Sequence, residues 1–260
     1  MLKGPLFRAK SALQQASAES IKSDSPMEKL MEIVDGTRIS TIAVAELIGR
    51  PLNDVERKFA PKMIYITGPM EVPLPRPRVS IVGSRKASPD GLASAGTIAN
   101  ILAKKEVTII SGLAEGIDTS AHEAAIAAKG RTVAVLGTPL NKVYPRKNLE
   151  LQHEIMRRHL AVSQFPIGHA TKPKDFVLRN RTMALISDAT IIVEAGETSG
   201  SLHQGWEALR LGRSLFIWKS ILGKGLSWPE KMMRYGAMEL SDPEDVLEVL
   251  PSALQMPLFQ

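Results

Sequence analysis

Glycine-rich turns recur in this sequence at points where backbone amides could bind an anion. Four such turns follow short apolar runs: Gly83-Ser84-Arg85, residues 111–118, Gly137-Thr138-Pro139 and residues 196–201. Glycine lets N–H groups approach a phosphate closely, and a helix starting after the turn adds a favourable partial charge. A single turn of this kind is also explained by the geometry of a strand-to-helix connection. Four of them on one sheet edge favour a phosphate-binding edge.

A basic segment with one aromatic residue, residues 172–181, is the second candidate site. It contains Lys172, Lys174, Arg179 and Arg181 against the single acid Asp175, with Phe176 among them. If a helix begins near Asp175, then Phe176, Arg179 and Asn180 share one side of it. A base can stack on Phe176 while the basic groups neutralise phosphates, which is typical of single-stranded nucleic acid binding. The alternatives are a core role for Phe176 and a solvated helix face for the charges.

The sequence lacks the residues that several other kinds of chemistry require. The chain has no cysteine, which excludes disulfides, thiol catalysis and Cys-ligated metal. There is no Gly-Lys-Ser/Thr phosphate loop and no complete G-x-G-x-x-G, and the five histidines show no metal-ligand spacing. We therefore expect no metal, no cofactor and no catalytic residues.

One pair of titratable residues has helical spacing. Asp118 and His122 are four residues apart, so they could act as an acid–base pair. The favoured alternative is structural: Asp118 accepts hydrogen bonds from loop amides at a helix start, and His122 is bonded to it.

Alternating apolar runs and amphipathic stretches indicate the elements that position these residues. Strands are predicted at residues 79–82, 107–110, 132–136, 161–163, 190–194 and 214–217. Helices are predicted between them at residues 90–105, 119–129, 149–159, 176–187 and 201–211. Continuously apolar strands alternating with helices predict an α/β fold with a doubly wound, mostly parallel, Rossmann-like sheet. Ligands of such sheets bind beyond the carboxyl ends of the strands, where the glycine turns lie.

The chain before about residue 78 has a different pattern. We expect a small helical region with helices at residues 27–34, 40–48 and 53–59, with Ser40 and Asn53 as N-caps, and a short strand at residues 63–66. The proline-punctuated residues 72–77 are predicted to be an extended linker. The predicted organisation is residues 1–78 as a helical region with linker, residues 79–250 as the main domain, and residues 251–260 as a tail.

Composition and charge set outer limits on function. The chain has 260 residues, with 33 Lys plus Arg against 27 Asp plus Glu, and its formal net charge is +6. This excess favours an anionic partner. No apolar run approaches the roughly 18 residues of a membrane span, and the N-terminus is unlike a secretory signal, so we expect a cytoplasmic protein with no membrane partner.

The ordered motifs resemble the DprA/Smf family of DNA-processing proteins over about residues 60–248. The matching pieces are Ile81-Val82-Gly83-Ser84-Arg85, residues 111–118 with Ala121-His122, Ala134-Val135-Leu136-Gly137 with Tyr144-Pro145 and Asn148, Phe176 with Arg179-Asn180-Arg181, Val193-Glu194-Ala195, Ser199-Gly200-Ser201 and Gly236-Ala237. The resemblance implies an extended Rossmann-like domain that binds single-stranded DNA, helps to load a RecA-type recombinase, works in transformation or recombination, forms a homodimer and is not an enzyme.

The resemblance also implies which residues face the DNA. They are Gly83, Ser84 and Arg85 in the first loop, Ser111, Gly112 and Gly116 in the second, Lys172, Lys174, Phe176, Arg179, Asn180 and Arg181 in the basic segment, and Ser199, Gly200 and Ser201 in the last turn. Phe176 is the implied base-stacking residue. Asp118 and His122 match motif positions that we interpret as structural.

The sequence departs from the family pattern in places. Ser163-Gln164-Phe165-Pro166 replaces the usual Ser-Glu-Pro, and His203-Gln204-Gly205-Trp206 replaces small residues after Ser201-Leu202. The winged-helix tail of many members has no counterpart, since little sequence follows Leu250.

Two alternative functions remain. The first is a sensor that binds a small nucleotide with the same loops. The second is a nucleoside-monophosphate phosphoribohydrolase-like enzyme of the broader Rossmann-like set. Those enzymes carry Pro-Gly-Gly-x-Gly-Thr-x-x-Glu, whereas this chain has His203 where the Glu is expected. Without that carboxylate, acid–base help at the sugar is hard to provide.

Overall fold

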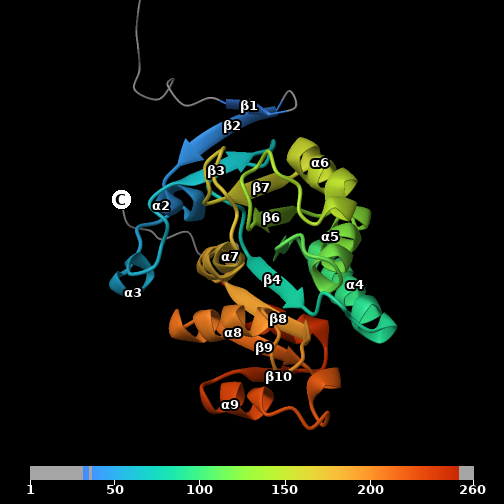
Figure 1. The fold of residues 1–260 in the computed structure, drawn as a ribbon. Coiled ribbons are helices and arrows are strands. Elements are labelled where there is room, and N and C mark those ends of the chain that lie inside the picture. The colour runs from blue at the N-terminus through green and yellow to red at the C-terminus, as the bar shows by residue number, and fades with distance from the viewer. Residues whose placement is uncertain (1–31, 35–36, 252–260) are drawn as a thin grey trace, which may run out of the picture. The chain divides into compact units, whose positions relative to one another are not determined.

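A sheet of short strands rich in β-branched residues forms the centre of the structure. The computed structural model describes residues 32–34 and 37–251, and within them ten strands form one sheet in the order β1-β2-β3-β7-β6-β5-β4-β8-β9-β10 (Figure 1). The parallel part comprises β4 (Arg78–Gly83), β5 (Thr108–Ser111), β6 (Thr132–Leu136), β7 (Leu160–Ser163), β8 (Ala189–Glu194), β9 (Ser214–Trp218) and β10 (Met238–Leu240). All six predicted strands of this part are confirmed. The three-residue β10 was not predicted.

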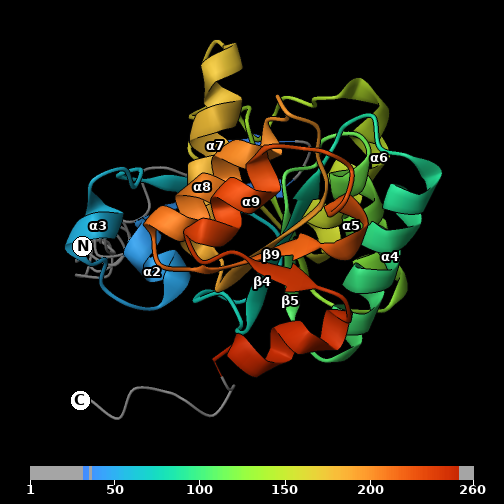
Figure 2. The same cartoon turned by 90° about the horizontal axis from the view of Figure 1, so that it is seen from below.

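Helices cover both faces of the sheet. One face packs on α4 (Pro89–Lys104), α5 (Ile117–Ala127) and α6 (Leu149–Arg158), and the other on α7 (Pro173–Ile186), α8 (Ser201–Arg210) and α9 (Trp228–Arg234) (Figure 2). Short 3-10 turns lie at η2 (Arg146–Asn148), η3 (Lys219–Ile221) and η4 (Pro243–Val249). Strands with both faces covered must be apolar throughout, which explains their sequences. The predicted doubly wound Rossmann-like fold is confirmed.

The chain reverses its direction of travel across the sheet at the centre. From β4 it moves outward through β5, β6 and β7, then crosses over through α7 to β8 on the other side of β4. Because consecutive helices change face at this reversal, no helix closes the gap above the carboxyl ends of β4 and β8. Their glycine turns therefore open into the same space.

The N-terminal part of the described chain extends the sheet. β1 (Glu32–Val34), β2 (Thr37–Ile42) and β3 (Ile64–Thr67) are antiparallel neighbours, and β3 pairs with β7. The predicted helix at residues 40–48 is therefore wrong at its start: α2 is confined to Val44–Ile48, and Ala43 rather than Ser40 precedes it. The reason is strand pairing, because Ser40, Thr41 and Ile42 align with β3. The predicted helix at residues 27–34 lies outside the described residues up to residue 31, and its last three residues are β1.

The second predicted helix start is confirmed. Asn53 caps α3 (Asp54–Arg57) in a reciprocal box, in which Glu56 N donates to Asn53 Oδ1 and Asn53 N donates to Glu56 Oε2, both at 2.9 Å. This pairing satisfies two amides that a helix start leaves without partners.

The predicted linker at residues 72–77 is packed against the sheet. Leu74 is only 2% exposed and its amide donates to the Leu47 carbonyl at 2.9 Å. Pro77 O accepts a hydrogen bond from Thr108 N at 2.8 Å. The proposed boundary at residue 78 therefore does not divide the described chain into separate bodies. Of the predicted tail, residues 252–260 lie outside the described part.

A buried carboxylate ties α3 to the chain after α8. Glu56 is 1% exposed and accepts hydrogen bonds from Arg50, at 2.8 and 2.6 Å, and from Arg213 at 2.5 Å. The hydrogen bonds from Arg50 are the main reason that the pKa of Glu56 is lowered to about 2. Burial alone would raise this pKa, so the two guanidinium groups outweigh the cost of desolvation.

This carboxylate makes stability depend on pH in a defined window. Because its pKa is lower in the folded chain, Glu56 stabilises the fold above its ordinary pKa, near 4.5, and loses that contribution as the pH falls toward 2. We expect Glu56→Gln to lower the free energy of unfolding by about 3 kcal/mol at pH 7 and to converge with wild type near pH 2. Urea denaturation at pH 7, 5 and 3 measures this difference.

Asp54→Asn is the matched control. Asp54 pairs with Arg57 on the surface, and its side chain is 93% exposed. We expect a change within about 0.5 kcal/mol at each pH, because exposed ion pairs contribute little. A Glu56→Gln difference that does not shrink between pH 5 and pH 3 would contradict the assignment.

Candidate functional site

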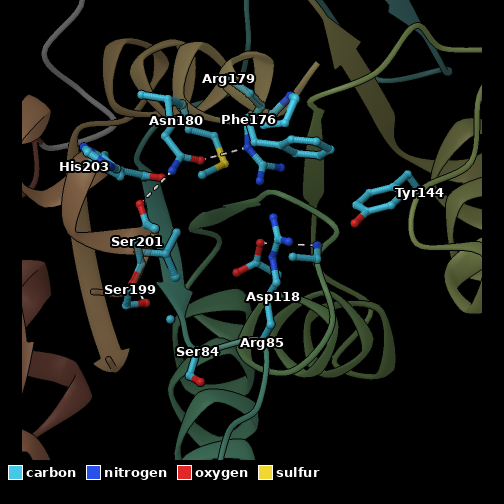
Figure 3. A pocket seen from close by; sticks show the side chains of 18 of the residues that line it. Ser84, Arg85, Asp118, Tyr144, Phe176, Arg179, Asn180, Ser199, Ser201 and His203 are labelled. Atoms are coloured by element: carbon cyan, nitrogen blue, oxygen red, sulfur yellow. Dashed lines mark hydrogen bonds between the residues drawn. The ribbon is translucent and has the colours of Figure 1, made fainter. Parts of the chain in front are cut away.

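The glycine turns border a cleft of about 860 Å³ above the carboxyl ends of β4 and β8. Its walls come from the segments that follow β4, β5, β6, β7 and β8, from the first turn of α8 and from α7 (Figure 3). Of the predicted site residues, the structure brings ten to this cleft: Gly83, Ser84, Arg85, Lys172, Phe176, Arg179, Asn180, Ser199, Gly200 and Ser201. It does not bring Ser111, Gly112, Gly116, Lys174 or Arg181 into the lining.

The loop after β4 forms the floor of the cleft. Ser84 N donates to Glu194 O at 2.7 Å, and Ser84 O accepts from Ile117 N at 3.2 Å, so the loop is fixed between β8 and α5. Gly83 is needed for this packing, since a Cβ there would lie 2.7 Å from Glu194 O. Arg85 follows in the same loop with an exposed side chain. A main chain held by hydrogen bonds thus presents an exposed guanidinium to the cleft.

Two aromatic rings lie together at the cleft. The ring centres of Phe176 and Tyr144 are 5.2 Å apart at an interplanar angle of 49°. The Arg85 guanidinium carbon lies 5.4 Å from the centre of the Phe176 ring, within cation–π range. Gly137 makes room for Phe176, because a Cβ there would be 2.5 Å from the ring. Half-buried Phe176 therefore faces the cleft beside a cation and a second ring, and is not a core residue.

Tyr144 was not among the predicted site residues. It lies in the loop between β6 and α6, is 48% exposed and lines the cleft with Lys142 of the same loop. The available signal was the Tyr144-Pro145 pair, which is one of the motif pieces of the family resemblance and follows the predicted strand at residues 132–136. Lys86 and His203 also line the cleft and were not predicted as site residues.

The turn before α8 forms the opposite wall. Ser199 Oγ and Ser201 Oγ are 2.8 Å apart, and no side chain caps α8. The amides of Leu202 and His203 donate to Ser199 O and Gly200 O within the turn, at 3.1 and 3.2 Å. A Cβ at Gly196 or Gly200 would meet no atom within 4 Å. Packing within the protein therefore does not require glycine at these two positions. Open space in front of a helix N-terminus is suited to an anion.

Arg179 has a different role from the predicted one. It is 4% exposed, and its guanidinium donates to Val135 O at 2.9 Å, to Gly112 O, and to Asn180 Oδ1 at 2.9 Å. Burial lowers the pKa of Arg179 to about 10, so it stays charged at neutral pH. Through its Nη1 group, Arg179 joins α7 to the loop after β5 and to the end of β6, so it positions these elements around the cleft that it also lines.

Asn180 completes this connection. Its Nδ2 donates to Gly200 O at 3.0 Å, which links α7 to the turn before α8. Arg179 and Asn180 together therefore connect α7 to the loop after β5, to the end of β6 and to the turn before α8.

The predicted second phosphate loop is turned into the protein. Ser111 is fully buried and donates to Ile81 O at 2.7 Å, while Gly112 N donates to Asp118 Oδ2 at 3.1 Å. Gly116 has a φ of +80°, and a Cβ there would lie 2.9 Å from Arg85 O, so it allows the two loops to touch. These three residues support the first loop, which corrects the prediction that they face a phosphate.

The structural interpretation of Asp118 is confirmed and that of His122 needs correction. Asp118 Oδ2 accepts from the amides of Gly112 and Ala114, at 3.1 and 3.3 Å. His122 Nδ1, however, pairs with Thr132 Oγ1 at 2.7 Å and not with Asp118. Burial lowers the pKa of His122 to about 3, so the ring is neutral at physiological pH. The two residues do not form an acid–base pair.

The basic segment divides between two surfaces. Lys172 is exposed at the cleft, and Lys174 is exposed beside it. Arg181 points elsewhere, with its guanidinium carbon 4.7 Å from the centre of the Phe59 ring. Helix geometry explains the division, because Phe176 and Arg181 are about 140° apart around α7.

The described residues lack two further kinds of feature. Residues 32–34 and 37–251 contain no group of three or more His, Cys, Asp or Glu side chains arranged to hold a metal ion. In the same part of the chain, no helix has the length and apolarity to cross a membrane.

Comparisons with known proteins agree on one family. Residues 50–251 match the family model of DNA recombination-mediator protein A. The DNA processing protein DprA of Bacillus subtilis is 34% identical over 194 residues, which cover 74% of this chain and 65% of that protein. The chain thus spans just under two thirds of this curated relative.

Solved structures give the same result. The X-ray structure of DprA from Streptococcus pneumoniae matches with a TM-score of 0.70 and 30% identity, covering 82% of this chain and 75% of that one. DprA from Helicobacter pylori, whose structure is described in terms of its single-stranded DNA binding mode, matches with a TM-score of 0.66 and 25% identity, covering 81% and 94%.

Substitution by alanine should affect stability differently at Gly112, which is closely packed, and at Gly200, which faces open space. A Cβ at Gly112 would lie 2.7 Å from Asp118 Oδ2 and closer still to the Arg179 guanidinium, whereas Gly200 has a φ of −61° and open space. We expect Gly112→Ala to lower the free energy of unfolding by about 1–3 kcal/mol and Gly200→Ala to change it by less than about 0.5 kcal/mol. Urea denaturation of both variants measures this, and equal stabilities would contradict the role given to Arg179.

Proposed function

The chain belongs to the DNA recombination-mediator protein A (DprA/Smf) family, and we propose that it binds single-stranded DNA in the cleft between β4 and β8. One observation carries the proposal: Arg85, Phe176 and Tyr144 form a cation–aromatic group across the cleft from the open glycine turn before α8. A base stacks on an aromatic ring while its phosphates are held by a guanidinium and main-chain amides. The cleft offers these groups on opposite walls.

The open glycines support the same ligand. Close packing within the protein explains the glycine at four positions: Gly83, Gly112, Gly116 and Gly137. It does not explain Gly196 and Gly200, where a Cβ would meet no atom within 4 Å. A ligand backbone that approaches the α8 turn closely explains why no side chain occupies that space. The Helicobacter pylori relative shares the fold, and its structure is described in terms of a single-stranded DNA binding mode, which supports a nucleic acid as that ligand.

The wider role follows from the family. We propose that the chain acts as a recombination mediator: it protects single-stranded DNA, works as a homodimer and helps to load a RecA-type recombinase during recombination or DNA uptake. The family assignment supports this role. The residues proposed to touch the strand are those of the cleft with exposed or open positions: Gly83, Ser84, Arg85, Lys172, Phe176, Ser199, Gly200 and Ser201.

The residues of the cleft favour binding over glycosidic hydrolysis. Among the described residues that line it, Asp118 supplies the one carboxylate, and two main-chain amides already bind that group. His203 lines the cleft where the phosphoribohydrolase pattern has Glu. General acid–base catalysis needs a group that can reach the substrate proton, so we propose a protein without turnover.

Fluorescence anisotropy with oligothymidylates of increasing length, each at several salt concentrations, tests the proposal. Affinity should rise with length and fall with salt, with a log–log slope of about −0.7 for each phosphate neutralised. Equal affinity for a mononucleotide and for longer strands would contradict it in favour of the nucleotide sensor. Release of free base from a nucleoside monophosphate would contradict it in favour of the enzyme.

Arg85 and Phe176 should have separable effects. Arg85→Ala removes an exposed cation, so we expect the magnitude of the salt slope to fall by about 0.7. Phe176→Ala removes the stacking ring, so binding should weaken by about 1–3 kcal/mol with the slope nearly unchanged. Arg158→Ala is the control, because Arg158 is an exposed arginine on α6 outside the cleft. An unchanged affinity in both cleft variants would overturn the proposed site.

Gly200→Ala adds an independent check. The methyl group would project into the open part of the cleft without touching protein atoms. We therefore expect weaker binding of oligothymidylate, by about tenfold, at an unchanged free energy of unfolding. The same anisotropy titration measures it, and wild-type affinity would show that the strand does not approach the α8 turn.

A further inference from the structure

A second group of cations and an aromatic ring lies outside the cleft. Phe59, just after α3, is 42% exposed, and three side chains contact its ring: Lys58 Nζ at 5.4 Å, Arg181 Cζ at 4.7 Å and Arg210 Cζ at 4.8 Å from its centre. We call these four residues the Phe59 cluster. They come from the segment just after α3, from α7 and from α8, so only the folded chain brings them together (Figure 1).

The cluster carries an excess of positive charge. Arg210 is held by Glu207, at 2.9 and 2.5 Å, and donates to Val55 O at 3.1 Å, so it has a structural role. Within the part of the chain that the structure describes, Lys58 and Arg181 form no ion pair with a carboxylate.

The nearest acids do not compensate them. Glu56 is taken by Arg50 and Arg213, and Asp54 by Arg57. Cations that lie near one another repel, and the folded chain leaves two of them on a half-exposed ring without a counter-ion. A bound anion would supply the missing charge.

Two helices that line the cleft connect it to the cluster. On α7, Val177 lines the cleft and Arg181 is one turn further on the same side. On α8, His203 lines the cleft and Arg210 lies two turns further on the same side, about 10 Å along the axis. These two packed helices therefore run from the cleft to the two arginines that contact the Phe59 ring.

We propose that the Phe59 cluster is a second contact for the same single strand of DNA, which leaves the cleft along α7 and α8. Lys58 and Arg181 bind its phosphates, and the exposed part of the Phe59 ring supports a base or sugar. This inference rests on the proposed function of the cleft. Continuity with the cleft favours a DNA strand over an acidic protein segment as the occupant.

The strand-length dependence of binding tests the inference. Oligothymidylates of 4 to 20 nucleotides are titrated by anisotropy against the full chain and against Lys58→Gln/Arg181→Gln. We expect short strands that fill the cleft to bind as they do to wild type. Long strands should lose about tenfold in affinity, and the magnitude of their salt slope should fall by about 1.4, for two phosphates.

Three further variants make the result specific. Arg57→Gln is the matched control on α3, since Arg57 is exposed and paired with Asp54, and it should bind strands of every length like wild type. Arg181→Lys keeps the charge and should restore the salt slope. Phe59→Ala should weaken only long strands. Circular dichroism melting confirms that each variant is folded.

The outcomes separate this inference from the function on which it rests. If Arg85→Ala weakens strands of every length while the Phe59 cluster variants bind all lengths like wild type, the cleft binds DNA and the second contact is refuted. If no strand binds to the wild-type chain, the proposed function itself fails. Equal weakening of short and long strands by the double variant would also overturn the inference, because the cluster would then act through the cleft.

Discussion

The cleft depends on one buried guanidinium. Arg179 donates to the carbonyls that end β5 and β6, and through Asn180 its helix is joined to the turn before α8. These carbonyls lie at strand ends, where the sheet no longer supplies partners, so a cation with several donors in a fixed plane satisfies them together. Asp118, whose carboxylate is held nearby by loop amides, reduces the cost of burying this cation. The loops that face the cleft are thus fixed before any ligand arrives, which reduces the ordering that binding requires.

The glycines of the strand ends divide by what surrounds them. Those after β4, β5 and β6 allow loops and side chains to pack closely, and they make the inner support of the site. Those after β8 face open space at the start of α8. The same residue type therefore serves two purposes on one sheet edge, and only the three-dimensional surroundings distinguish them. A glycine motif in a sequence identifies the edge where ligands bind, but not which of its members touch them.

The sequence predicted the sheet, its helices and the location of the site, because buried parallel strands and strand-end glycines leave local patterns. It did not predict the orientation of Arg179 and Arg181. Both are basic residues on one helix, and their roles depend on carbonyls and on a ring that come from distant parts of the chain. Ser40 to Ile42 were misassigned for a similar reason, since their pairing partner β3 is more than twenty residues away. Tyr144 belonged to a motif of the family resemblance, but its ring contact with Phe176 joins two distant segments and leaves no local pattern. β10 was too short to show a period.

The antiparallel strands at one side of the sheet have a consequence for how the chain can be divided. β3 supplies hydrogen-bond partners along β7, whose residues are all buried. A fragment that began at the first parallel strand would uncover β7 as an edge, with unpaired amides and carbonyls beside apolar side chains. Such an edge recruits any other extended segment, including a second fragment of the same kind. The strands before β4 therefore help to prevent association of the domain through the edge of β7, because they cover it. A fragment without them would tend to self-associate through that exposed edge.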